Sequence, residues 1–500
     1  MIDPRSSVEH AAGATALLLT ALLASGCASN DRYVRPADPP QTSYIQMPAQ
    51  AEGTVAGTAG EAVPHVSLGE EPPDAWWSLL GSDQVNRLAS LALKNNQSLA
   101  GAQAHLAAAR ERIRAARGAW YPQVDVSAGV QRTRFGATVL GPLAKDFPLF
   151  SAYAAGPEVS YDLDVFGGTR ARVAQAAAAA QYESAELGAV ALSVSGNVVI
   201  EVLEIAKVRA QIRVVEEIVA DDEHMLGLMR AAREAGAVSA MDVLSAQSQT
   251  DHDRTLLPPL HQQLSVAQDA LANLIGVAPP DWTPVDVDLD AISLKEDLPI
   301  VLPSELVRRR PDIGAAEAQL HAASAAVGIA TADMYPHFTL TARIGEEGLL
   351  GGGPSETAWN LLGGLTAPIF HGGALTAQRR AAQDEYQAAF AAYQQTVLNA
   401  FGQVADTLQA LGNDADSLRT QRQALDSANA SLALTTQGYA AGNAGYLQVL
   451  DAQRLHQQAT LGVVQASSQR YVDAVKLLLA AGGRVELPNR DRSHSHQFPP

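Results

Sequence analysis

The sequence predicts a mainly α-helical protein with a membrane β-barrel, in which two tandem repeats each contribute two strands. Three observations predict this fold class. Two halves of the chain share matching segments in the same order. Long segments keep an apolar period of about 3.5 residues, which is typical of coiled coils. Between them, short segments alternate apolar and polar residues, as strands with one apolar face do.

The composition limits the classes of function open to the chain. Its 500 residues are 47% hydrophobic, which suffices for a large core and excludes a largely disordered protein. The net charge of -18 argues against nucleic acid as a partner, because phosphate binding needs the opposite sign. A single cysteine excludes a disulfide framework and a multi-thiolate metal site. After the N-terminal segment, no charge-free apolar run of about 18 residues predicts a transmembrane helix.

Residues 1–26 are predicted to be a secretory signal peptide. The stretch 11–24 is uncharged, apolar and too short to span a bilayer with margin. Cys27 follows directly in the sequence LASGC, which resembles a bacterial lipoprotein box, and Ala28 resembles sorting to the outer membrane. We therefore expect an S-diacylglycerol and an N-acyl lipid on Cys27, anchoring an extended segment at 27–75. The alternative is an ordinary signal peptide followed by an incidental cysteine.

Internal similarity divides most of the chain into a first repeat at 76–275 and a second repeat at 302–482. The matching segments are 105–123 with 319–337, 165–168 with 369–373, and 236–247 with 442–453. Chance similarity between alanine-rich helices does not explain three pairs at nearly the same offset. The proline-rich stretch 276–301 predicts a linker with short local structure, and 483–500 reads as a disordered tail.

The first repeat predicts strands at about 123–134 and 157–166, and the second predicts strands at about 337–345 and 359–370. In each of them, apolar residues alternate with polar ones, although less regularly in the last. Such strands fit either a soluble sheet packed on its core or a membrane barrel with lipid outside and water inside. In the barrel, the polar face would line the lumen with Asp125, Glu158, Asp162, Asp164, His337 and Arg343.

The strand count requires an oligomer. Four strands cannot close a barrel, and open edges in hydrocarbon would leave unpaired backbone amides. Two copies would give eight strands, whose interior is filled by side chains, whereas a conduit needs more. We therefore expect a homotrimer in contact with outer-membrane lipid.

Long helices are predicted at 168–235 and 374–440. From Val194 to Met229, nine of eleven positions at alternating spacings of four and three are apolar. At about 1.5 Å per residue, the whole helix 168–235 approaches ~100 Å, which suits a span between two membranes better than a compact domain. Glycines then provide turns, and the chain returns in helices at 241–275 and 446–480. Pro258-Pro259 is expected to interrupt the first of these return helices.

Three segments resemble the TolC superfamily, and more closely the OprM/NodT branch of outer-membrane lipoproteins that serve RND-type efflux pumps. The segments are 76–110, 302–320 with its Arg310-Pro311-Asp312 motif, and 445–455. The resemblance covers about residues 31–482. It implies a trimer with a twelve-stranded β-barrel and a coiled-coil α-helical periplasmic barrel, located in the outer membrane of a Gram-negative bacterium.

The resemblance also implies a function, namely a passive duct for small molecules that an inner-membrane RND-type pump expels through a periplasmic membrane-fusion adaptor. We expect the adaptor to dock on the two turns, which comprise Gly236, Ala237, Val238 and Ser239, and Gly442, Asn443, Ala444 and Gly445. The resemblance places a periplasmic gate at Leu447 and Asp451, with Arg454 available for pairing and Tyr439 on the facing helix. The alternative for Asp451 and Arg454 is an ordinary surface pair.

Two other functions stay open: a duct for type I protein secretion, and a lipid-anchored coiled-coil adaptor with a soluble sheet. No sequence motif predicts catalysis, so we expect neither an enzyme nor a cofactor other than the lipid. Asp286, Asp288 and Asp290 imitate the start of a calcium loop, but Ala291 replaces the required glycine. They are expected to form an acidic connector, and the histidines of the tail are expected to be solvated rather than metal-bound.

Overall fold

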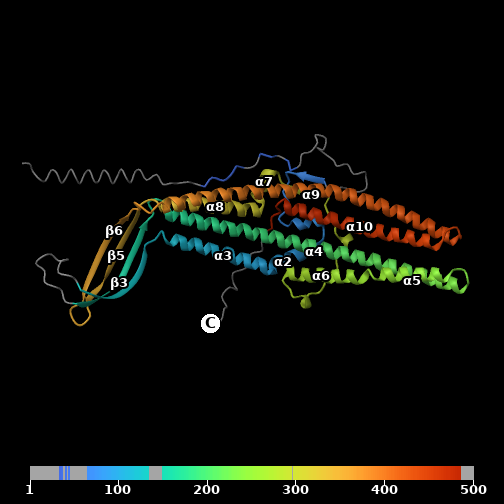
Figure 1. The fold of residues 1–500 in the computed structure, drawn as a ribbon, viewed down its shortest axis with the longest axis horizontal. Helices are drawn as coiled ribbons and strands as arrows, with labels where there is room; N and C mark the ends of the chain where they lie inside the picture. Colours follow the sequence, from blue (N-terminus) through green and yellow to red (C-terminus); the bar gives the residue numbers. More distant parts are fainter. Residues whose placement is uncertain are drawn as a thin grey trace, which may run out of the picture. The chain divides into compact units, whose positions relative to one another are not determined.

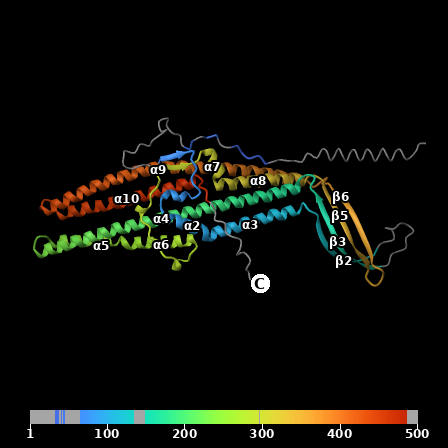
Figure 2. The ribbon, with the colours of Figure 1, turned by 180° about the vertical axis from the view of Figure 1, so that it is seen from behind.

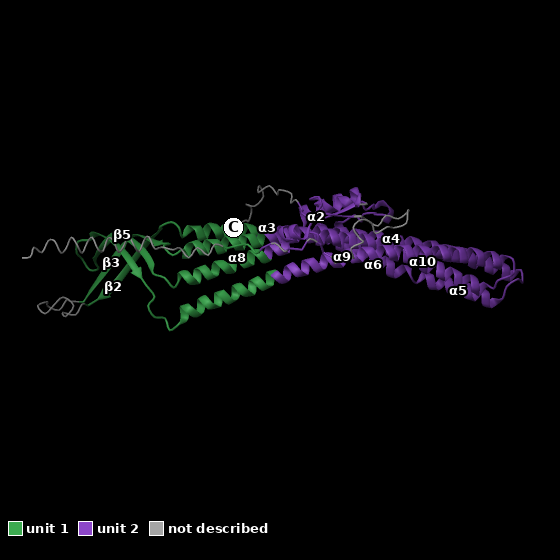
Figure 3. Ribbon diagram, turned by 90° about the horizontal axis from the view of Figure 1, so that it is seen from above, with its two compact units in different colours: residues 1–36, 106–183, 316–393 green, residues 37–105, 184–315, 394–500 purple. Residues whose placement is uncertain are grey.

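The computed structural model describes residues 33–37, 40–41, 43–44, 65–134, 149–295 and 297–485. The predicted signal peptide, Cys27 and most of the predicted tail lie outside the described residues. The chain forms two compact units (Figure 3). Unit 1 contains residues 1–36, 106–183 and 316–393, and unit 2 contains residues 37–105, 184–315 and 394–500. Both units draw on both repeats.

Unit 1 contains a four-stranded antiparallel sheet in the order β2-β3-β5-β6. Its strands are β2 (Gln123–Thr133), β3 (Phe150–Leu163), β5 (His337–Leu349) and β6 (Glu356–Thr366), which lie side by side in Figure 2. The predicted mainly helical fold with four antiparallel strands is confirmed. Several predicted strand boundaries are wrong. β3 spans Phe150–Leu163 rather than 157–166, β5 ends at Leu349 rather than 345, and β6 spans Glu356–Thr366 rather than 359–370.

The helices of unit 1 approach each other closely through small residues. They are the portions within 106–183 and 316–393 of four helices labelled in Figure 1: α3 (Gln97–Gly118), α4 (Gly168–Glu234), α8 (Pro311–Ala332) and α9 (Ala374–Ala440). A Cβ built on Gly328 of α8 would lie 3.3 Å from the Cβ of Ala171 on α4. The same distance separates a Cβ on Gly168 from Ala332. Larger side chains here would force α4 and α8 apart.

The core of unit 2 forms around short elements and helix ends. They are η1 (Trp76–Leu80), α2 (Asp83–Asn95), α5 (Ala240–Arg254), α6 (Leu257–Ile275), α7 (Pro303–Arg309) and α10 (Tyr446–Ala480). The stretch 276–301 contains η3 (Pro279–Asp281), η4 (Leu289–Ala291) and β4 (Asp297–Ile300), which pairs in parallel with β1 (His65–Leu68). Trp76, Leu80, Leu298 and Leu306 are among the fully buried side chains.

The return helix of the first repeat is broken, whereas that of the second is continuous. α5 ends at Arg254, and α6 begins at Leu257 with proline in its first turn, where a missing N–H costs nothing. Gly276 then ends α6 in the left-handed conformation, with φ of 80°. In the second repeat, α10 runs without interruption from Tyr446 to Ala480. The sequence predicts an interruption of the return helix at Pro258-Pro259, and the structure places the break slightly earlier, at residues 255–256.

Among the described residues, one helix is long and apolar enough in part to cross a membrane by length and composition alone. This helix is α4, and 56% of its apolar window is buried inside the protein. A core helix of a soluble domain shows the same property. The sequence criterion, which required a charge-free run, did not identify it.

Candidate functional site

The sheet has one polar face and one apolar face. Directly opposed residues form a row across all four strands, from Asp125 through Glu158 and Arg343 to Asn360. Since opposed residues of neighbouring strands point to the same side, Arg343 lies between a carboxylate and an amide on one face. Asp162 and His337 occupy the same face by alternation along their strands.

The adjacent rows carry the apolar face. One runs from Val124 through Val159 and Ala342 to Leu361. In a second row, Val126 opposes Pro157, and Ile344 opposes Trp359. Val126 is 82% exposed and Trp359 is 76% exposed. An apolar face left this open is the arrangement expected of a surface that meets lipid.

Asp164 was predicted to face the lumen from a strand, and this placement is wrong. β3 ends at Leu163, and the Asp164 carboxylate accepts hydrogen bonds from the backbone N–H groups of Thr169 and Arg170 at 2.8 and 2.9 Å. The Arg170 Nε also donates to it at 3.2 Å. Asp164 therefore caps the N-terminus of α4, where a carboxylate stabilises the free N–H groups.

The two turns predicted as docking sites have the same backbone design. Gly236 and Gly442 have φ of 78° and 77°, which favours glycine. In each turn the next residue donates to a carbonyl five positions back, Ala237 to Ala232 and Asn443 to Gly438, both at 2.8 Å. A Cβ built on either glycine would meet nothing within 4 Å, so both turns present open backbone.

The returning helices are capped differently after these turns. Ser239 forms a capping box with Asp242, in which the backbone N–H of Ser239 donates to the Asp242 carboxylate at 2.9 Å. The hydrogen bond that the Ser239 hydroxyl donates to Asp242 at 2.7 Å, followed by the backbone bond, lowers the pKa of Asp242. In the second turn, the backbone N–H of Gly445 donates to the Gln448 Oε1 at 3.2 Å. Both helix starts are thus fixed within one turn of the exposed glycines.

Three of the predicted gate residues, Leu447, Asp451 and Arg454, lie on the first three turns of α10. Arg454 Nη2 lies 3.1 Å from the Asp451 Oδ1, and both side chains are more than half exposed. Leu447, one turn earlier, is 69% exposed. Within one chain these three side chains therefore face away from the core and are free to meet other copies.

Tyr439 lies in a different environment from the other gate residues. Its hydroxyl donates to the Met229 sulfur at 3.4 Å, and its ring centroid lies 5.8 Å from that of Tyr446. Burial, followed by the charge of Asp242, raises the pKa of Tyr439. The structure therefore places Tyr439 against an apolar cluster that joins the two repeats and consists of Leu226, Met229, Ala246, Tyr446 and Val449. It also adds Asp242, which the sequence analysis did not single out for this site.

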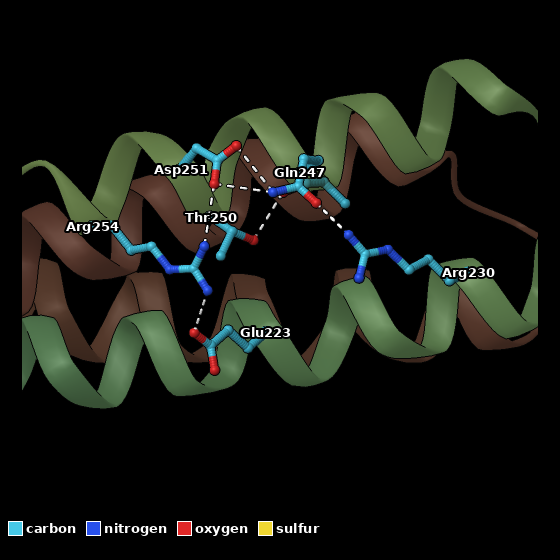
Figure 4. A network of polar contacts seen from close by, with 7 residues as sticks. Glu223, Arg230, Gln247, Thr250, Asp251 and Arg254 are labelled. Carbon is cyan, nitrogen blue, oxygen red and sulfur yellow. Dashed lines mark hydrogen bonds and ion pairs between the residues drawn. The ribbon is translucent and has the colours of Figure 1, made fainter.

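An exposed network of polar contacts links α4 to α5 close to the first turn (Figure 4). Arg254 reaches Glu223 of α4 at 2.5 Å and Asp251 of its own helix at 3.2 Å. Gln247 donates to Asp251 at 3.0 Å and accepts from Arg230 of α4. The sequence analysis missed this network, because its contacts to Glu223 and Arg230 of α4 are long-range, and the local spacings within α5 are common on helix surfaces.

Two aspartates of the acidic connector form ion pairs with arginines of α4. Asp286 is paired with Arg209, and Asp288 with Arg213, both of α4. Within the described ranges, no group of three His, Cys, Asp or Glu side chains could hold a metal ion. The two tail histidines, His494 and His496, lie outside the described residues.

Comparisons with known proteins agree with this geometry. The family model described as "Outer membrane efflux protein" matches residues 88–277 and 302–483. Outer membrane protein OprJ of Pseudomonas aeruginosa is 31% identical over 95% of this chain and 96% of its own length. The probable outer membrane lipoprotein SilC of Salmonella typhimurium is 28% identical over 82% of this chain and 87% of its own. The solved structure of the outer-membrane channel OprN superposes with a TM-score of 0.79 at 25% identity, covering 90% and 99% of the two chains.

Proposed function

Because this chain belongs to the outer membrane efflux protein family, it is an outer-membrane channel of an efflux pump, and we propose that three copies complete its duct. The protein is not an enzyme. Three sheets of four strands would make a twelve-stranded barrel, and the long helices would continue the lumen into the periplasm. In this assembly an inner-membrane RND-type pump supplies the energy, and the channel conducts its small-molecule cargo passively.

The observation that carries this proposal is the division of the sheet into two faces. The row from Asp125 to Asn360 would face water in the lumen, while the row from Val124 to Leu361 would face lipid. β2 and β6 each have one unpaired edge within the described sheet. Pairing β2 of one copy with β6 of the next would satisfy those edges, as hydrocarbon requires.

The two turns are proposed as the docking surface for a periplasmic membrane-fusion adaptor. Gly236–Ser239 and Gly442–Gly445 present open backbone, and two large apolar side chains lie close to the first turn. Met241 is 75% exposed and Leu244 is 67% exposed. Exposed apolar side chains beside a rigid turn suit a partner that buries them.

We assign the periplasmic gate to Leu447, Asp451 and Arg454, with Tyr439 behind them. Around a threefold axis, three Asp451 carboxylates would repel one another, and Arg454 would neutralise them through charge-assisted bonds. Each pair contributes only about 0.5 kcal/mol or less to helix stability, so its removal should leave the fold intact.

Replacing both Asp451 and Arg454 by alanine should therefore increase the ion conductance of purified trimers in planar bilayers. The matched control is Asp416→Ala with Arg419→Ala, because this pair has the same spacing on α9, a distance of 2.7 Å and similar exposure. If the double variant at Asp451 and Arg454 has the same conductance as the wild type, the gate assignment is rejected and the two residues form only a surface ion pair. An equal increase in both variants would show a nonspecific effect of charge removal.

The lipid on Cys27 is proposed as an anchor additional to the barrel. A Cys27→Ser protein should still reach outer-membrane fractions and migrate as a heat-modifiable, SDS-resistant trimer, because closed barrels hold themselves in the bilayer. The measurement is semi-native electrophoresis of separated membranes. A soluble monomer would instead favour the lipid-anchored adaptor with a soluble sheet. Antibiotic susceptibility together with secreted-protein profiles of a deletion strain separates efflux from type I protein secretion.

A further inference from the structure

Two buried carboxyl groups meet where the first repeat packs on the second. Asp222 of α4 is 5% exposed, and Asp253 of α5 is 2% exposed. Asp222 occupies a position that the apolar period of α4 assigns to the helix interface. Its Oδ2 has no hydrogen-bond partner among the described residues. Buried carboxylates are rarely left in this state without a cation or a proton.

The contacts of Asp253 bridge the two repeats. Its Oδ2 accepts a hydrogen bond from Gln249 Nε2 of the same helix at 2.7 Å. The same oxygen accepts a second hydrogen bond from Gln457 Nε2 of α10 at 3.0 Å. Gln457 is itself buried, so this bond lies inside the joint between α5 and α10. Any movement of one hairpin past the other must break it.

The charges around the pair favour one retained proton. Burial, the hydrogen bond that the protonated Asp222 carboxyl would donate to Asp253, and the charges of Asp253 and Asp221 together raise the pKa of Asp222 to about 8. Each of these acidic groups disfavours a second negative charge. Arg254, which follows Asp253 in the sequence, is engaged by Glu223 and Asp251 on the exposed side.

Tyr446 is the other titratable group that faces Asp222. Burial raises the pKa of Tyr446 to about 12, with further contributions from Asp222, Tyr439 and Asp242. Its hydroxyl therefore stays neutral throughout the range in which Asp222 titrates.

The carboxyl pair lies next to the apolar cluster that supports the proposed gate. Asp222 is one helical turn before Leu226, which packs with Met229, Ala246, Tyr446 and Val449. Tyr439 packs against the same cluster. A change at the pair is thus transmitted to the gate through directly packed side chains of α4, α5 and α10.

We propose that Asp222 and Asp253 form a proton-controlled latch that holds α5 against α10 and keeps the periplasmic tip closed. The proposal rests on the proposed channel and specifies how its gate is regulated. With one proton, the two carboxyl groups attract each other, and Gln457 completes the joint. Without it, two buried negative charges repel and favour separation of the hairpins.

The sign of the pH dependence follows from the direction of the shift. A carboxyl whose pKa is raised by folding favours the folded joint while it is protonated, and this contribution is lost as the pH rises through the raised pKa. The latch is therefore closed at neutral and acidic pH and released above about pH 8. Between pH 7 and pH 9, the fraction of deprotonated pairs rises about tenfold for such a pKa.

A second carboxyl pair provides an internal contrast. Asp414 of α9 lies beside Asp473 of α10, and burial followed by the charge of Asp473 raises the pKa of Asp414 to about 6. Here Lys476 donates to Asp473 at 2.9 Å, and Lys476 and Arg470 both oppose the shift. This cation-compensated pair titrates in a separate range, so a transition near pH 8 belongs to Asp222.

The test is the open probability of purified trimers in planar bilayers between pH 6 and pH 9.5. The wild type should show an increase of up to about tenfold centred near pH 8, following the deprotonated fraction. Asp222→Asn and Asp253→Asn keep the side-chain shape and remove the shared proton, so both should stay closed and lack the increase. The control is Asp269→Asn, because Asp269 is an exposed carboxylate of α6.

Infrared spectra provide a second readout that does not depend on gating. The wild type should show a protonated carboxyl band that disappears near pH 8, and Asp222→Asn should lack it. The latch would be overturned if both asparagine variants kept the wild-type increase in open probability with pH, or if the wild type showed no such increase. If Asp451→Ala with Arg454→Ala also fails to conduct at every pH, the proposed channel assembly itself is refuted.

Discussion

Replacing Val126 by arginine should prevent assembled trimers from appearing in the outer membrane. Val126 is 82% exposed near the middle of β2 and lies on the apolar face opposite Pro157. An arginine on the lipid face costs about 2–4 kcal/mol at the bilayer midplane. A threefold assembly carries the substitution three times, so the total is roughly 6–12 kcal/mol. The measurement is the amount of SDS-resistant trimer in outer-membrane fractions.

Ser127→Arg is the matched control for this prediction. Ser127 is the next residue of β2 and opposes Gly156 on the polar face. The same charge would then enter the aqueous lumen, where the cost is small, and trimers should form in nearly normal amounts. If Ser127→Arg abolished assembly while Val126→Arg did not, the two faces of the sheet would be reversed. If neither substitution had an effect, the sheet would not be in a membrane at all.

Alternation of residue types predicted the faces of the sheet because it is a local signal. The apolar residues of β2 recur every second position, and this pattern fixes one side of the sheet for lipid or core. The same signal failed at the start of β3. Residues 150–156 are mainly small, so both faces look alike in the sequence, yet Phe150–Gly156 pair with β2 residue by residue. Backbone pairing, rather than side-chain contrast, extends that strand.

Helix ends were predictable where glycine marks them. The sequence predicted a helix over 374–440, and α9 spans Ala374–Ala440, since Gly373 and Gly442 lie beside its ends with positive φ. The role of Asp164 was not predicted, because a polar residue at a strand end can extend the strand or cap the next helix. Only the position of the Thr169 and Arg170 amides decides between them.

Long-range contacts explain most of what the sequence analysis missed. Gln457 and Asp253 are 204 residues apart, and no local period relates them. Asp222 did leave a trace, because it is one of two acidic residues, with Glu201, in a helix stripe whose other positions are apolar. Such an exception identifies a buried polar site, but its partner is found only when the repeats are packed together.

Replacing Arg310 by alanine should unfold unit 2 at a markedly lower temperature. Arg310 is 8% exposed, and its guanidinium donates to both Asp312 oxygens, at 3.0 and 2.7 Å. It also donates to Gln403 Oε1 of α9 at 2.7 Å and to the Ala480 carbonyl at the end of α10 at 2.9 Å. One side chain thereby joins the start of α8, the middle of α9 and the end of α10.

The geometry of the Arg310-Pro311-Asp312 motif shows what arginine contributes at this position. Pro311 begins α8 and holds Arg310 in an extended conformation, with φ of -66° and ψ of 124°. Asp312 lies in the first turn of α8, where the helix dipole and the Ile313 N–H stabilise its charge. The planar fork of arginine matches this carboxylate with two bonds and still reaches two further acceptors.

Truncating this side chain leaves a half-exposed carboxylate, an amide and a carbonyl without their donor, at a cost of about 2–4 kcal/mol. Arg310→Lys should recover only part of the loss, because an ammonium cannot form the two parallel bonds. The measurement is the thermal unfolding midpoint by circular dichroism. Arg309→Ala is the neighbouring control: Arg309 pairs with the exposed Glu71, so its removal should cost about 1 kcal/mol or less. Equal losses at both positions would mean that the buried fork contributes no more than a surface ion pair.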